Sequence, residues 1–154
     1  MAPADHPDAA TWTLLYDADC GFCRATLAGL LAFDLGKRVR PAAIQSPEGS
    51  ALLADLEPAE RLSSWHLISP EGERFSAGAG APPLLRLLAG GRVPAAVLAA
   101  APGPTDRAYH WVADHRSTLS RFVPSRAKTG ATERIRRHAA EAGGGAGADG
   151  SGAA

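Results

Sequence analysis

The chain of 154 residues contains little cysteine and few aromatic side chains, and it has no excess of either charge. Lysine plus arginine balance aspartate plus glutamate at 16 each, so no overall field draws the protein to nucleic acid or to an acidic membrane surface. No apolar run approaches the roughly 20 residues that a membrane-spanning helix needs, since the run from Ala25 to Phe33 stops at Asp34. The N-terminus has neither a basic leader nor an apolar core of a signal peptide. These absences predict a single cytoplasmic domain that binds neither nucleic acid nor membrane.

Two cysteines are present, and they lie close together as Cys20 and Cys23 in the segment Y-D-A-D-C-G-F-C-R. Cytosolic thiols keep ordinary disulfides reduced, so a closely spaced pair is more often catalytic or metal-binding than structural. The preceding residues, Thr11 to Tyr16, have the composition of a β-strand. The leucines that follow recur at helical spacing from Leu27 to Leu35, and Gly36 is a good helix stop. The pair is therefore expected at the junction of a strand and a helix.

The remaining pattern predicts a mixed α/β architecture. Ser46 can cap a helix, Pro47 fits its first turn, and Glu48 suits the positive end of its dipole. The chain should then form a β-hairpin and return to helices. In chain order, the expected elements after the first helix are a strand at Val39–Ile44, a helix from 47 to about 56, hairpin strands at Trp65–Ser69 and Glu73–Ser76, and helices at Pro82–Leu88, at Pro94–Ala101 and after Thr105. This order is the thioredoxin-like arrangement, β-α-β-α-β-β-α with an additional C-terminal helix.

Composition also suggests where the domain ends. Residues 1–10 are rich in proline, alanine and aspartate and are expected to be disordered. The apolar pattern spans residues 11–122 and fails beyond Pro124, and the last residues are a Gly-Ala segment. We therefore expect one domain at 11–122, followed by a flexible tail at 123–154.

Three segments together resemble a known family. They are Y-D-A-D-C-G-F-C-R, I-Q-S-P-E-G and Y-H-W-V-A-D-H-R, and they are similar to the DCC family of predicted thiol-disulfide oxidoreductases, also called domain of unknown function 393. One departure is Ala18, where that family usually has glycine. The resemblance implies a thioredoxin-like fold and a redox function. Its matching positions are Asp17, Cys20, Cys23, Gln45, Ser46, Tyr109, Ala113 and Arg116.

The chemistry of a C-x-x-C pair at a helix start suggests the roles of both thiols. Cys20 would lie where free backbone N–H groups and the helix dipole stabilise a thiolate, which makes it the expected nucleophile. Cys23, one turn later, is the expected resolving thiol, which attacks the mixed disulfide on Cys20. Asp17 could accept a proton from Cys23 through water, or it could simply cap the loop.

The residues expected to contact substrate are those nearest the cysteines. Gly21 and Phe22 lie between them. Many thioredoxin-like proteins place a cis-proline just before the first hairpin strand, but this chain reads L-S-S-W there, so Ser63, Ser64 and Trp65 are expected to line the partner groove. That groove should therefore differ from the groove of thioredoxin.

A further set of residues is expected to support the site. Arg116 falls on an apolar helix face, where it could pair with Asp17 or Asp34 or reach the site, and a salt bridge is the favoured use. Arg24 could offset the negative charges near Cys20. The supporting residues are Asp19, Arg24, Gln45, Ser46, Tyr109 and Arg116.

Two interpretations of the cysteine pair stay open. The first is an enzyme that exchanges disulfides with a protein or a small thiol, as a monomer in the bacterial cytoplasm and without a cofactor. The second is a non-catalytic thioredoxin-like interaction domain whose cysteines are vestigial or metal-bound. Zinc would need two more ligands, and His110 and His115 are badly spaced for that purpose. Haem attachment would need histidine in place of Arg24. We expect no metal.

Overall fold

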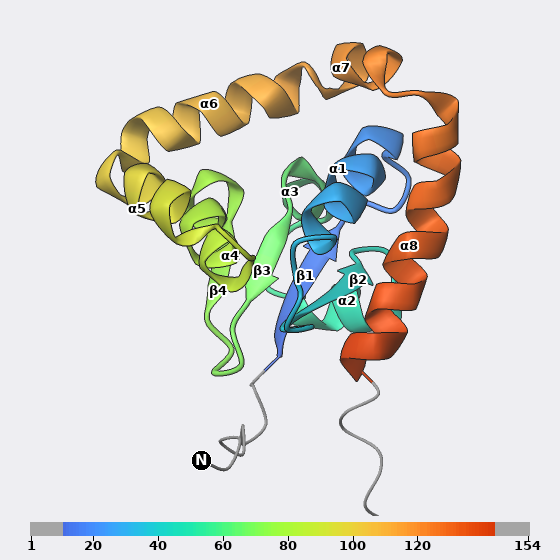
Figure 1. Cartoon of the computed structure of the whole chain (residues 1–154), viewed down its shortest axis with the longest axis horizontal. Coiled ribbons are helices and arrows are strands. Elements are labelled where there is room, and N and C mark those ends of the chain that lie inside the picture. The colour runs from blue at the N-terminus through green and yellow to red at the C-terminus, as the bar shows by residue number, and fades with distance from the viewer. Residues whose placement is uncertain (1–10, 144–154) are drawn as a thin grey trace, which may run out of the picture.

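The computed structural model describes residues 11–143, and a four-stranded sheet forms its centre (Figure 1). The strands are β1 (Trp12–Tyr16), β2 (Val39–Ala43), β3 (His66–Ile68) and β4 (Arg74–Ser76), in the spatial order β2-β1-β3-β4. β1 pairs with β2 in parallel, whereas β3 is antiparallel to both β1 and β4. This topology confirms the expected α/β, thioredoxin-like fold class.

Helices follow the strands and make up most of the second half of the chain (Figure 1). In Figure 1, α6 and α7 pass over the top of the molecule, and α8 then descends beside α1 and β2. The helices are α1 (Gly21–Leu31), α2 (Pro47–Leu52), α3 (Pro58–Ser63), the 3-10 helix η1 (Ala77–Gly80), α4 (Ala81–Leu87), α5 (Arg92–Ala100), α6 (Pro102–Asp114), α7 (Arg116–Phe122) and α8 (Ser125–Gly143).

The sheet buries a different set of side chains on each face. Successive residues of a strand point to opposite faces, so Leu14 and Leu15 of β1 enter separate clusters. The smaller cluster joins Leu15 to Ile44, Leu53 and Ile68 near α2. The larger one draws on α1, α4 and α8: Leu14, Leu27, Ala28, Leu31, Val39, Leu67, Leu84, Ala131 and Ile135.

Several local predictions are confirmed. Ser46 caps α2, because its Oγ accepts a hydrogen bond of 3.0 Å from the backbone N–H of Gly49. Pro41, which cannot donate to a ladder, lies in the edge strand β2. The predicted hairpin forms β3 and β4, although both strands are shorter than expected.

The first helix ends earlier than its leucine pattern predicted. α1 stops at Leu31, and Leu35, which was expected on its buried face, is 76% exposed. The carboxylate of Asp34 explains the difference, because it accepts hydrogen bonds from the backbone N–H groups of Arg38 and Val39 at 3.0 and 2.9 Å. These bonds stabilise a turn that leads directly into β2.

The expected flexible tail from residue 123 is wrong for residues 125–143, which form α8. This helix packs along α1 and β2 and buries Ala131, Ile135 and His138. A stripe made of one alanine, one isoleucine and one histidine is a weak apolar signal, which is why the pattern was missed. Residues 1–10 and 144–154, also expected to be disordered, lie outside the described residues.

A buried polar network connects α8 to the turn after α1. His138 Nε2 donates to Asp34 Oδ2 at 2.9 Å, and both side chains are almost fully buried. Lys37 Nζ lies 3.1 Å from the other ring nitrogen of His138 and 2.7 Å from Glu141. Since buried polar groups cost stability unless they are paired, this network favours one position of α8.

We predict that Ile135→Ala destabilises the protein by about 2–5 kcal/mol, because it removes a buried side chain from the α8 seam. Urea unfolding followed by circular dichroism measures the change. Arg136→Ala, an exposed change on the same helix, should leave the midpoint nearly unchanged. Equal midpoints for wild type and Ile135→Ala would show that α8 does not dock.

A second prediction concerns His66, which is 2% exposed in β3. Its ring nitrogens lie 2.7 Å from Ser76 Oγ and 3.0 Å from the Arg61 carbonyl, and burial lowers its pKa in the folded protein. In the unfolded chain the pKa of His66 is about 6.5. The contribution of neutral His66 to the free energy of unfolding is therefore fully present above this pH and is lost as the pH falls below it. Thermal unfolding between pH 7.5 and 5 should show a smaller decline for His66→Gln than for wild type and for the exposed-site control His115→Gln.

Candidate active site

The two cysteines form a disulfide at the junction of β1 and α1. Cys20 is the N-cap residue of α1, and its sulfur accepts a hydrogen bond of 3.2 Å from the backbone N–H of Cys23. The Cα atoms lie 5.2 Å apart, one helical turn from each other. The first free N–H groups of a helix stabilise negative charge, so the sulfur of Cys20 occupies a place that favours a thiolate.

The turn before Cys20 is held by the side chain of Gln45, which follows β2. Its amide nitrogen donates to Asp17 Oδ1 at 2.7 Å and to Asp19 Oδ2 at 3.3 Å, and its oxygen accepts from the backbone N–H of Ala18 at 3.2 Å. Asp17 Oδ1 also accepts from the backbone N–H of Asp19 at 2.9 Å. β1 and β2 are paired in the sheet, so these bonds fix the approach of the chain to Cys20.

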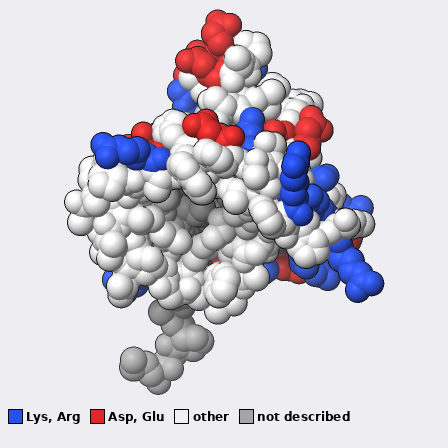
Figure 2. Space-filling model, turned by 90° about the horizontal axis from the view of Figure 1, so that it is seen from above, with Lys and Arg blue, Asp and Glu red and all other residues white. Residues whose placement is uncertain are grey.

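Positive side chains come to the same end of α1 from two helices. Arg24 of α1 donates to Thr132 of α8 at 3.4 Å, and its buried Nε has no hydrogen-bond partner among the described residues. The side chain of Lys128 covers Gly21, since a methyl group added there would lie 3.3 Å from the Lys128 side chain. From above, Lys and Arg gather over α8, whereas the middle of this face is largely uncharged (Figure 2).

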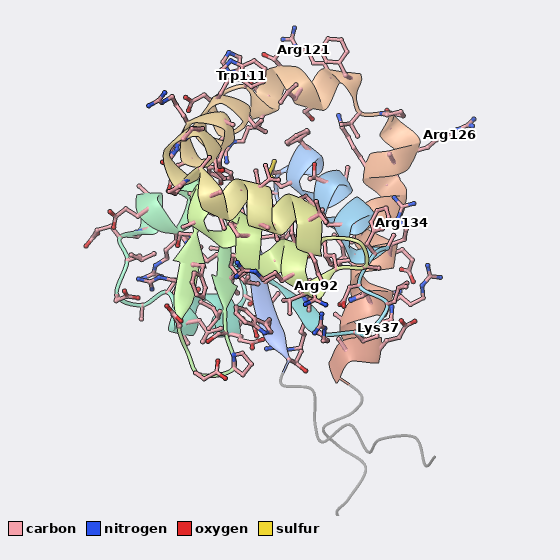
Figure 3. The ribbon with its side chains drawn as sticks, turned by 60° about the vertical axis from the view of Figure 1, so that its left-hand side comes forward. Lys37, Arg92, Trp111, Arg121, Arg126 and Arg134 are labelled. Carbon is pink, nitrogen blue, oxygen red and sulfur yellow. A yellow bond between two sulfur atoms is a disulfide. The ribbon has the colours of Figure 1, made fainter. Side chains whose placement is uncertain are left out.

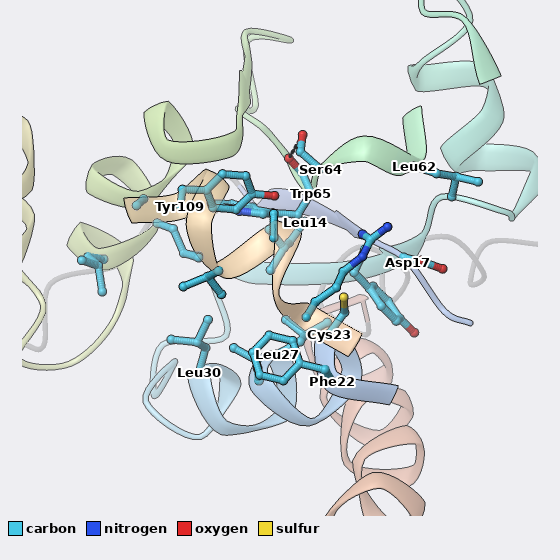
Figure 4. Close-up of a pocket in the computed structure, with 18 residues that line it drawn as sticks. Leu14, Asp17, Phe22, Cys23, Leu27, Leu30, Leu62, Ser64, Trp65 and Tyr109 are labelled. Carbon is cyan, nitrogen blue, oxygen red and sulfur yellow. Dashed lines mark hydrogen bonds between the residues drawn. The ribbon is translucent and has the colours of Figure 1, made fainter. Parts of the chain in front are cut away.

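An apolar cavity of about 330 Å³ lies beside the disulfide (Figure 4). Its walls come from β1, α1, the segment from α3 into β3, α4, α6 and the first residue of α7. Cys23 contributes to the wall, as do Phe22 on one side and Trp65 on the other (Figure 4). The cavity-lining residues are Leu14, Tyr16, Asp17, Phe22, Cys23, Thr26, Leu27, Leu30, Leu62, Ser64, Trp65, Ala81, Leu84, Leu85, Tyr109, Val112, Ala113 and Arg116.

Tyr109 contributes a hydroxyl group to this largely apolar wall. Burial raises its pKa, an effect offset in part by hydrogen bonds with the Trp65 backbone and the Ser64 side chain and by the charge of Arg116. The phenol therefore stays neutral at physiological pH. Gly80 makes room for the indole of Trp65, because a methyl group at that glycine would lie 2.7 Å from the ring.

Arg116 is not paired as the sequence suggested. It forms no salt bridge with Asp17 or with Asp34, whose carboxylate bonds instead to His138 and to backbone N–H groups. A break in the helix at His115 makes Arg116 the first residue of α7. Its side chain lines the apolar cavity together with Tyr109.

The structure brings most of the expected site residues together. Phe22, Ser64 and Trp65 line the cavity with Cys23 and Asp17, while Asp19, Gln45 and Arg24 surround the approach to Cys20. Two expected contacts lie apart from the cavity. Gly21 is covered by Lys128, and Ser63 ends α3, where its hydroxyl donates to the Glu60 carbonyl.

Sequence reasoning missed the contribution of α8 and much of the cavity wall. Lys128 and Thr132 fell in the segment expected to be a tail. Leu62 belongs to α3, whereas Leu84 and Leu85 belong to α4, and no spacing in the chain indicates that these two helices meet at one cavity.

The two histidines that were considered as zinc ligands are bonded within their own helix. Within residues 11–143, no group of three or more His, Cys, Asp or Glu side chains could hold a metal ion. His110 and His115 each contact a backbone carbonyl of their own helix, those of Asp106 and Trp111 respectively. None of the helices in this part of the chain combines the length and apolarity that a bilayer crossing requires.

Comparison with known protein families supports a redox function for the cysteine pair. The sequence model of the DCC1-like thiol-disulfide oxidoreductase family matches residues 14–122, from β1 to the end of α7. No curated protein and no solved structure matched the chain. The matched region includes Cys20 and Cys23, which the fold places as a disulfide at the start of α1. The chain belongs to the DCC1-like thiol-disulfide oxidoreductase family.

Proposed function

We propose that the protein exchanges disulfides through Cys20 as the nucleophile and Cys23 as the resolving thiol. In the reduced protein, the thiolate of Cys20 attacks one sulfur of a partner disulfide, forms a mixed disulfide and releases a thiolate. Cys23 then attacks the sulfur of Cys20 and releases the second partner thiolate. Two electrons pass from the protein dithiol to the partner, and the protein is left with its Cys20–Cys23 disulfide.

The observation that carries this assignment is the position of Cys20 as the N-cap of α1. Its sulfur accepts a hydrogen bond from the Cys23 N–H, and it lies at the positive end of an eleven-residue helix. Cys23 is already inside the first turn, where it forms part of the wall of the apolar cavity. An apolar environment disfavours a thiolate, so the two sulfurs have different surroundings.

Charged neighbours act on Cys20 in opposite directions. Asp17 and Asp19 precede it and disfavour a thiolate, although Gln45 donates hydrogen bonds to both carboxylates. Lys128 and Arg24 supply positive charge at the same helix end. We infer that the two positive side chains and the helix N-terminus together outweigh the two carboxylates. Cys20 is then the more reactive thiol.

Two hydrogen bonds to its Oδ1 support a structural role for Asp17, which holds the turn before Cys20. Its position in the wall beside Cys23 also suits a proton acceptor that works through water. That catalytic role stays a prediction. The cytoplasmic setting and the monomeric state also stay predictions, as does the identity of the thiol or disulfide partner.

We predict that iodoacetamide alkylates Cys20 in the Cys23→Ser variant severalfold faster at pH 7 than it alkylates Cys23 in Cys20→Ser. The physical reason is the larger thiolate fraction at the helix N-terminus. Rates are measured by mass spectrometry over a pH series. In glutathione disulfide, Cys23→Ser should also accumulate a mixed disulfide on Cys20. Equal alkylation rates for the two thiols would contradict the assignment of the nucleophile.

A further prediction is that Lys128→Gln slows alkylation of Cys20 at pH 7 by up to about fivefold, since partly exposed charge interactions are worth about 0.2–1 kcal/mol. The measurement uses the Cys23→Ser background at low salt. Arg126→Gln is the matched control, because Arg126 points away from the fold on the same helix (Figure 3). If Lys128→Gln slows alkylation no more than the control does, Lys128 does not stabilise the thiolate of Cys20.

A further inference from the structure

The apolar cavity beside Cys23 is large enough to hold a small organic molecule. Its volume of about 330 Å³ falls within the range of small-molecule binding sites. That volume corresponds to about ten water molecules, yet its wall of leucine, tryptophan and phenylalanine side chains offers water few hydrogen-bond partners. Displacing this water with an apolar molecule is therefore favourable.

Two charged residues, Asp17 and Arg116, line the cavity, and they differ in the side-chain hydrogen bonds that they form with the described residues. Asp17 accepts hydrogen bonds from Gln45 and from the Asp19 N–H. Arg116 is half-buried, and within residues 11–143 it forms neither a salt bridge nor a side-chain hydrogen bond. A guanidinium carries five N–H donors in a fixed fork that matches a carboxylate. The cavity thus combines an apolar wall with one cationic side chain, Arg116, that is unpaired within residues 11–143.

We propose that this cavity binds the organic part of a small substrate, an apolar thiol or disulfide that carries a carboxylate. The carboxylate pairs with Arg116, and the apolar part contacts Trp65 and the leucines of α1 and α4. Cys23 forms part of the wall, so the sulfur of the bound molecule lies at this side of the cavity, next to the Cys20 sulfur to which Cys23 is bonded. This inference rests on the proposed dithiol function and narrows its substrate class.

The reaction at this site is a balanced exchange. A bound disulfide, R–S–S–R, is reduced to two R–SH molecules, while the dithiol of Cys20 and Cys23 is oxidised to the protein disulfide. The two electrons and two protons that the protein loses are those that the small molecule gains. An apolar side chain of a polypeptide partner matches the apolar wall but supplies no carboxylate for Arg116.

The test compares three disulfides as oxidants of the reduced protein in stopped flow. 5,5′-Dithiobis(2-nitrobenzoate) is aromatic and carries carboxylates, 4,4′-dithiodipyridine is aromatic without a carboxylate, and 2-hydroxyethyl disulfide is small and polar. Each rate is divided by the rate of the same disulfide with dithiothreitol, which removes intrinsic reactivity. We expect the normalised rate to be at least about tenfold higher for the nitrobenzoate than for hydroxyethyl disulfide, and to saturate with concentration.

Variants identify the group that binds the carboxylate. Arg116→Gln should lower the normalised rate of the nitrobenzoate to about the value for dithiodipyridine and leave the other two rates unchanged. Arg121→Gln is the matched control, since Arg121 lies on α7 and points away from the body of the fold, as does Trp111 of α6 (Figure 3). Naphthalene-2-carboxylate, which has no sulfur, should inhibit the nitrobenzoate reaction competitively, whereas naphthalene-2-methanol should inhibit it less.

The outcomes separate this inference from the function on which it rests. The cavity assignment would be overturned if the three disulfides reacted at equal normalised rates and if neither Arg116→Gln nor the naphthalene carboxylate changed them. The thiol chemistry would still stand. Failure of every oxidant to restore the Cys20–Cys23 disulfide would instead refute the dithiol function. A disulfide-linked peptide that reacts faster than all three small molecules, without inhibition by the carboxylate, would assign the cavity to a polypeptide partner.

Discussion

The hydrogen bond from the Cys23 N–H to the sulfur of Cys20 is the interaction on which the site depends. It exists because β1 ends just before the cysteines and α1 begins just after Cys20. The sheet fixes β1 between β2 and β3, and Gln45 holds the turn that joins β1 to α1. The position of one sulfur atom at the start of a helix is therefore determined by long-range pairing as well as by local structure.

The N-terminal half of the fold could be predicted from the sequence because its signals are local. Ser46 and Pro47 mark a helix start by their own chemistry, and the hairpin around Gly72 follows from turn residues between apolar runs. The end of α1 could not be predicted in this way. Leu35 fits the helical spacing, but the carboxylate of Asp34 stabilises a turn through bonds to the backbone N–H groups of Arg38 and Val39. The same carboxylate is bonded to His138 of α8, a partner that only the fold brings near.

The cavity and α8 escaped prediction for a related reason. Cys20, Cys23 and Asp17 could be proposed as site residues because they lie within one short motif, whereas the cavity wall draws on one strand and several helices. α8 buries Ala131, Ile135 and His138, and a stripe of this kind does not stand out in a chain rich in alanine. The family match ends at residue 122, yet the larger core cluster extends to Ile135. The folded unit is thus longer than the recognised domain.

The two edges of the sheet constrain how a partner can approach. One edge is β2, which contains Pro41, and the other is β4, which has three residues. A proline lacks the N–H that an added strand would need, and a three-residue edge offers few backbone groups for pairing. Strand addition, a common way for a sheet to capture an extended peptide, is thus disfavoured at both sides. We therefore expect a partner to be recognised by side chains near the N-terminus of α1, where the disulfide lies.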